Sequence, residues 1–216
     1  MTEPITAVEF HEAEGVEDWR VLFDGAYARF RTGSFATGVR LVNAIGSLAE
    51  AANHHPDVDL RYAGVTVRLS THETEGLSGR DIELARMISA AARDLDVSAD
   101  PTGVQVVQLT IDALVGPDVR PFWRAVLGYQ EVGDEDLIDP NGRGPSIWFQ
   151  GMDAPRQQRN RIHVDVSVPH EQAEARVAAA IAAGGRLVDH EHAPAWWTLA
   201  DAEGNEADVA TWMGRD

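Results

Sequence analysis

Apolar positions in the first hundred residues switch between helical and strand spacing. Within residues 34–53 apolar side chains recur at helical spacing, whereas Val65, Val67 and Leu69 alternate with polar neighbours. The predicted order is a short helix, two strands, a long helix, two strands and a second long helix. The expected ranges are 5–14, 19–23, 26–31, 34–53, 57–62, 66–70 and 78–95. This order predicts an α+β domain, with a four-stranded antiparallel sheet and helices on one face.

The segment 97–103, which reads VSADPTG, interrupts this pattern. It is polar, it contains an Asp-Pro step, and it lies where the helical periodicity stops. We therefore expect a domain boundary here, between a first domain of residues 1–100 and a second of residues 101–216.

After this segment the pattern starts again and then repeats. Each repeat consists of one strand, one helix and three further strands, over about 55 residues. The first repeat is expected at 104–111, 118–127, 130–132, 136–138 and 146–150. The second is expected at 161–168, 170–183, 186–190, 196–200 and 206–211. The second domain is thus predicted to pair two βαβββ modules.

Composition narrows the classes of partner and of chemistry. The formal charge of −17, from 35 acidic and 18 basic residues, disfavours nucleic acid and anionic membranes as partners. Cysteine is absent, which excludes disulfides, thiol catalysis and thiolate metal sites. The N-terminal stretch MTEPITAVEFHEAEG is acidic and has no apolar core, and no apolar run is long enough to span a membrane. We expect a soluble cytoplasmic protein.

Three of the eight histidines, His54, His55 and His72, lie close together in the sequence, with Glu50 and Asp81 on either side. Histidine titrates near neutrality, so the cluster suits general acid–base chemistry. Glu50 precedes His54 by four residues and shares its face if one helix carries both. The alternative is a surface loop with solvated histidines, or a fortuitous metal-binding pair.

The spacing of these residues resembles the signature of the pterin-4a-carbinolamine dehydratases, also called DCoH. The matching positions are Glu50, His54-His55-Pro56, Tyr62, His72 and Asp81, separated by three, five, nine and eight residues. The resemblance covers about the first hundred residues. It implies that His54, His55 and His72 carry the acid–base chemistry and that Glu50 and Asp81 orient the imidazoles. It also implies that the substrate is bound by Asn53, Pro56, Tyr62 and Arg80.

The second half resembles the vicinal oxygen chelate superfamily, which includes glyoxalase I and the bleomycin-resistance proteins. The similar stretches are PFWRAVLGY at 121–129, NRIHVDVSV at 160–168 and DAEGNEADV at 201–209. The ligand positions of metal-binding members fall on His163, Glu206, Gln108 and Gln150. This set holds one imidazole, one carboxylate and two neutral amides, so we expect no tightly bound transition metal. His190, His192, Trp196 and Trp197 either line a cavity mouth or form a solvated edge.

The resemblance of the first half thus implies a 4a-hydroxytetrahydrobiopterin (pterin-4a-carbinolamine) dehydratase. Acid–base elimination of water would give a quinonoid dihydropterin without a cofactor. The expected partners are the pterin substrate, an unknown small molecule at the second domain, and a second copy of the chain in a homo-oligomer. The alternative is a small-molecule binding or regulatory protein in which the glyoxalase-like domain has the main role. Which histidine is acid and which is base stays open.

Overall fold

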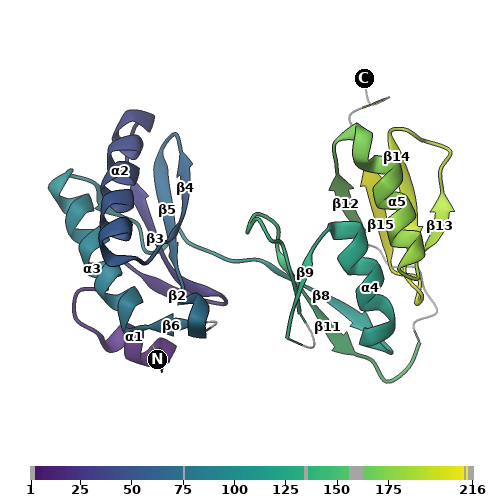
Figure 1. Cartoon of the computed structure of the whole chain (residues 1–216), viewed down its shortest axis with the longest axis horizontal. Helices are drawn as coiled ribbons and strands as arrows, with labels where there is room; N and C mark the ends of the chain where they lie inside the picture. Colours follow the sequence, from purple (N-terminus) through teal and green to yellow (C-terminus); the bar gives the residue numbers. More distant parts are fainter. Residues whose placement is uncertain (1–2, 75, 134–135, 156–162, 212, 214–216) are drawn as a thin grey trace. The chain divides into compact units, whose positions relative to one another are not determined.

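The computed structural model describes residues 3–74, 76–133, 136–155, 163–211 and 213. The chain divides into two compact units, residues 1–106 and 107–216, each with its own hydrophobic core (Figure 1). The division falls a few residues after the boundary expected from the sequence. In the described part of the chain, the helices are all too short or too polar to cross a membrane.

The first unit is built on an antiparallel sheet of the predicted kind. Its strands follow the order β2 (Arg20–Leu22), β3 (Gly25–Arg31), β5 (Gly64–Leu69), β4 (Asp57–Arg61). Figure 1 shows α2 (Phe35–Ala52) and α3 (Gly79–Asp94) side by side over one face of this sheet. The predicted α+β architecture, with helices on one face of an antiparallel sheet, is confirmed, and a short fifth strand joins the four that were predicted.

Short elements complete this unit. The helix α1 (Ala7–Glu12) is shorter than the predicted range, and it starts with a capping box in which Thr6 and Glu9 exchange hydrogen bonds. Two pairings were not predicted from the sequence. Strand β7 (Ser98–Ala99) pairs with β3, and β1 (Pro4–Ile5) pairs with β6 (Leu77–Ser78).

The core of the first unit lies between the helices and the sheet. Strand β5 turns Val65, Val67 and Leu69 inward, as their alternation predicted, and all three are fully buried. The helices contribute residues at helical spacing, among them Leu41 and Ile45 of α2. Full burial of a side chain of this size stabilises a fold by about 1.5–3 kcal/mol, so the core fixes how α2 and α3 meet the sheet.

The second unit contains the two predicted βαβββ modules. The first module comprises β8 (Gln108–Ala113), α4 (Gly116–Leu127), β9 (Gln130–Val132), β10 (Asp136–Ile138) and β11 (Ser146–Gly151). The second comprises β12 (Val164–Ser167), the short helix η2 (His170–Gln172), α5 (Ala173–Ala182), β13 (Arg186–Asp189), β14 (Trp196–Ala200) and β15 (Glu206–Ala210). The first two residues of the strand expected at 161–168 lie outside the described residues.

The two modules share one topology. In each, the first strand pairs in parallel with the fourth, giving the orders β8-β11-β10-β9 and β12-β15-β14-β13. Helices α4 and α5 pack against each other and share one core. The buried indole Nε1 of Trp123 on α4 donates to Asp201 Oδ2 at 2.9 Å, which ties the first module's helix to a loop of the second. This symmetry confirms the internal repeat.

Candidate functional site

The end of α2 places the first histidines of the cluster. Asn53 ends the helix in the left-handed conformation (φ 47°), and the backbone N–H of His54 donates to the carbonyl of Ala49. Pro56 follows and directs the chain into β4, because proline cannot continue a helix. The reversal turns His54 inward, where it is 6 % exposed, and leaves the side chain of His55 on the surface.

His54 forms a buried pair with Asp81. Its Nε2 lies 2.7 Å from Asp81 Oδ1, and Asp81 is fully buried. The other carboxylate oxygen, Oδ2, accepts from the Thr71 hydroxyl at 2.6 Å and from the Ser78 N–H at 2.7 Å. Because donors surround Oδ2, Asp81 acts as the acceptor, and we assign the His54 proton to Nε2. The ring is thereby held in one tautomer and one orientation.

Asp81 is also part of the start of α3. Ser78 is the N-cap, and Asp81 at the third helical position completes a capping box with it. Negative charge at a helix N-terminus is favoured by the helix dipole. The sequence contained no signal for Thr71, whose hydroxyl meets the carboxylate only in the folded domain.

His55 and Glu50 form a second, exposed pair. His55 Nε2 lies 3.2 Å from Glu50 Oε1, and their side chains are 57 % and 80 % exposed. A solvated pair of this kind contributes little to stability. Because both side chains are exposed, a ligand can reach them, whereas it cannot reach the buried His54–Asp81 pair.

Arg80 connects the two segments that carry the histidines. Its guanidinium donates to the backbone carbonyl of Asn53, and it lies 3.5 Å from Glu73. Glu73 follows His72 in the short helix η1 (His72–Thr74), where His72 is exposed. One side chain thus contacts both the residue before His54 and the residue after His72, so the three histidines belong to one region of the domain.

Tyr62 is not brought to this region within one chain. It lies in the turn after β4 and is 74 % exposed. The next residue, Ala63, accepts from the N–H of Thr32, near the start of α2. Since α2 has 18 residues and is about 27 Å long, this turn and His54 lie near opposite ends of the helix.

The ligand set expected for the second unit does not converge. Gln108 pairs with Ser146 and Gln150 with Asp112, so the two glutamines lie four steps apart along one ladder, about 13 Å. Two amides at that separation do not reach one ion. The set that the superfamily resemblance implies therefore does not fit a metal shared by all four positions.

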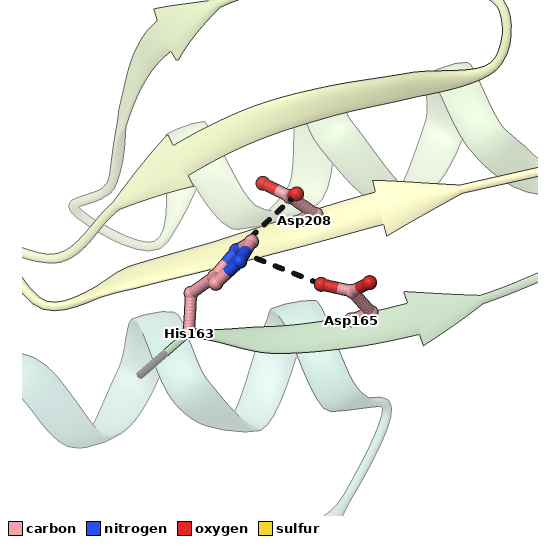
Figure 2. Close-up of side chains that lie close together, drawn as sticks. All are labelled: His163, Asp165 and Asp208. Carbon is pink, nitrogen blue, oxygen red and sulfur yellow. Dashed lines mark ion pairs between the residues drawn. The ribbon is translucent and has the colours of Figure 1, made fainter. Parts of the chain in front are cut away.

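Other residues cluster around His163 (Figure 2). Its Nδ1 lies 3.3 Å from Asp208 Oδ2 and 3.6 Å from Asp165 Oδ1. The predicted ligand Glu206 lies two residues before Asp208 on β15. Neither aspartate was predicted from the sequence, although the alternation His163-x-Asp165 and Glu206-x-Asp208 places each on the same strand face as a residue already singled out.

The histidines and tryptophans expected at a cavity mouth or a solvated edge lie around the start of β14. The rings of His192 and Trp196 stack at a centroid distance of 4.2 Å and an angle of 21°. Trp196 and Trp197 are half-buried, whereas His190 is exposed. Both alternatives, a cavity mouth and a solvated edge, stay predictions.

Comparison with known proteins agrees with both halves of this description. The sequence profile described as "Pterin 4 alpha carbinolamine dehydratase" matches residues 3–91, and the one described as "Glyoxalase-like domain" matches residues 108–210. A protein from Aquifex aeolicus, provisionally named pterin-4-alpha-carbinolamine dehydratase, is 40 % identical over 84 residues, which are 39 % of this chain and 85 % of the relative.

Two solved structures were also similar, each over about half of the chain or less. A "transcriptional coactivator/pterin dehydratase" from Brucella melitensis is 28 % identical, with a TM-score of 0.40, over 42 % of this chain and 99 % of that one. A "glyoxalase/bleomycin resistance protein/dioxygenase family enzyme" from Burkholderia phytofirmans is 20 % identical, with a TM-score of 0.41, over 50 % and 98 %. The sequence matches above show that this chain belongs to the pterin-4a-carbinolamine dehydratase family through its first domain, to which a glyoxalase-like domain is fused.

Proposed function

We propose that the first domain dehydrates 4a-hydroxytetrahydropterins and that the histidine cluster is its active site. The proposal is supported by one observation: two exposed imidazoles, those of His55 and His72, lie in the same region as the buried His54–Asp81 pair. Acid–base catalysis needs side chains that reach the substrate and neighbours that hold them in place. The cluster supplies both.

The reaction requires two proton transfers and no electron acceptor. The C4a–O bond breaks as the hydroxyl leaves with an added proton as water, and the N5 proton is removed as the C4a–N5 double bond forms. The product is a quinonoid dihydropterin. In this proposal one exposed imidazole gives the proton to the hydroxyl, and the other accepts the proton from N5.

The buried pair has a different role in this scheme. His54 is 6 % exposed and its Nε2 is engaged by Asp81, so that nitrogen does not contact a substrate. We assign the pair to positioning, because it fixes the residue before His55 and the first turn of α3, which carries Arg80. Arg80 contacts Asn53, which lies two residues before His55, and Glu73, which follows His72, so a pterin held by both imidazoles would meet Arg80 and Asn53.

The test is the dehydration rate of a 4a-hydroxytetrahydropterin with the full chain. His55→Ala and His72→Ala should each lower kcat by a factor on the order of 100, as expected for lost acid–base groups. Both side chains are exposed, so circular dichroism should show an unchanged fold. His190→Ala, an exposed histidine of the second domain, is the matched control and should keep full activity. A wild-type rate no faster than spontaneous dehydration would refute the proposal.

A further inference from the structure

We propose that the N-terminal strand β1 is a positioning element of the proposed active site, because it holds in place the segment that carries His72. The inference rests on the proposed function and extends it to residues outside the histidine cluster. Strand β1 consists of Pro4 and Ile5, and it pairs antiparallel with β6, so that Pro4 lies opposite Ser78 and Ile5 opposite Leu77. Strand β6 comes directly after the His72 segment in the chain.

The turn that carries His72 has few contacts of its own. It is the three-residue helix η1, and none of its three residues is buried. Segments with few buried contacts open at a low cost in free energy. The position of His72 is therefore set by the two ends of the turn. There Thr71 and Gly76 form a β-bridge, in which the Thr71 N–H donates to the Gly76 carbonyl at 2.6 Å.

The two ends of the turn are held in different ways. At the first end Thr71 is fully buried, and its hydroxyl donates to Asp81 Oδ2 at 2.6 Å. The second end leads from Gly76 into β6, whose partner strand is β1. Strand β1 is fixed in turn by α1, which follows it after one residue and buries Phe10 completely in the core. Strand β1 thus connects the second end of the turn to the core.

The same strand borders the buried network around Asp81. Ser78 and Asp81 are fully buried, and the Ser78 N–H donates to Asp81 Oδ2 at 2.7 Å. Pro4 lies opposite Ser78, so β1 occupies the side of β6 from which water would otherwise reach this backbone. Hydrogen bonds are stronger in the low-dielectric interior than in contact with water. Loss of β1 should therefore also weaken the hold of Asp81 on His54.

The pairing of β1 with β6 is small, and this makes it testable. Each strand contributes two residues, and an isolated two-stranded ladder is at best marginally stable in water. Since Pro4 has no N–H, Ile5 supplies the one N–H that β1 can give to the pairing. A change at position 5 therefore tests the strand and leaves the histidine cluster intact.

The test compares Ile5→Pro with the wild-type full chain in the dehydration of a 4a-hydroxytetrahydropterin. We expect kcat to fall about 10-fold or more, because a displacement of about 1 Å can cost about 100-fold in rate. KM should change little, since His72 acts in proton transfer. Ile5→Val keeps the N–H and a β-branched side chain and should restore most of kcat. Val8→Ala, at a 63 % exposed position of α1, is the control and should match the wild type.

Hydrogen–deuterium exchange gives a second readout, which does not depend on activity. The backbone amides of Gly76, Leu77 and Ser78 should exchange faster in Ile5→Pro than in the wild type. Deletion of residues 2–5 removes β1 altogether and decides the matter if Ile5→Pro fails to fold.

The outcomes separate this inference from the proposed function. A folded variant with wild-type kcat, or with unchanged exchange in β6, would overturn the role of β1. A wild-type chain without dehydratase activity would refute the proposed function, and the exchange rates would still decide whether β1 holds β6.

Discussion

Asp81 uses its two carboxylate oxygens for different purposes. Oδ1 holds the ring of His54, and Oδ2 receives the hydroxyl of Thr71 and the N–H of Ser78. Hydrogen bonds to a charged acceptor contribute about 1.5–3 kcal/mol each. The positioning of the proposed active site therefore depends on a hydroxyl that never contacts the substrate.

Thr71→Val tests this dependence, because valine keeps the shape of threonine and removes its hydroxyl. We expect a loss of about 1–3 kcal/mol in the free energy of unfolding, and a lower kcat with a nearly unchanged KM. Thr71→Ser, which restores the hydroxyl, should recover most of the activity. A Thr71→Val enzyme with wild-type kcat would show that Asp81 needs no help from this residue.

Asp139 offers a test of how the stability of the second domain depends on pH. Partial burial raises the pKa of its carboxyl, but the backbone N–H groups of Asn141, Gly144 and Arg143, at 2.8–2.9 Å, outweigh burial and hold the pKa below its usual range. A lowered folded-state pKa contributes stability above the unfolded value, and this contribution is lost as pH falls through the folded value.

Asp139→Asn should therefore be less stable than the wild type at neutral pH, and the difference should shrink below about pH 4. Urea unfolding between pH 3 and pH 7 measures it. A difference that stays constant or grows toward pH 3 would contradict the assigned role.

At the scale of elements, the contact between α4 and the segment after α5 is tight. Gly185 follows α5, and a Cβ added there would lie 2.3 Å and 2.5 Å from ring atoms of Phe122, which is fully buried. It would also lie 2.8 Å from the carbonyl oxygen of Ala180. Neither neighbour is a flexible side-chain end, so this position requires glycine.

Gly185→Ala should lower the free energy of unfolding of the second domain by about 1–3 kcal/mol, the usual cost of overpacking. Gly151→Ala is the matched control, since a Cβ there would meet nothing within 4 Å. Thermal or urea unfolding of both variants gives the comparison, and equal stabilities would show that the Phe122 ring moves aside freely.

The elements that the sequence predicted are those whose own periodicity is strong. Helices α2 and α3 and strand β5 each carry enough apolar positions to define one buried face. The pairings of β1 with β6 and of β7 with β3 involve two residues per strand and arise only when the domain packs. The cluster around His163 was missed for the same reason, because it depends on the register between strands about 40 residues apart.

For the whole molecule, the separate cores predict that the first domain is independent. Residues 1–106 should fold alone and keep the dehydratase activity, because all proposed site residues and β7 lie within them. Residues 1–96 form the informative comparison. This shorter fragment lacks β7 and also Val97, which is 5 % exposed in the core.

The shorter fragment should be less stable by about 2–3 kcal/mol, since burial of a valine alone contributes about 1.5–3 kcal/mol. Circular dichroism and urea unfolding distinguish the two fragments. An unfolded 1–106 fragment would show that the second domain is required for folding of the first.

The division between a buried pair and an exposed set of histidines has a consequence for how such a domain changes over evolutionary time. In a lineage that no longer needs the reaction, Glu50, His55 and His72 can vary freely, because their side chains are exposed and contribute little to folding. His54 and Asp81 stay under selection, since loss of either leaves the other buried and unpaired. A homologue that keeps only the buried pair would thus preserve the scaffold of the site after its activity has gone.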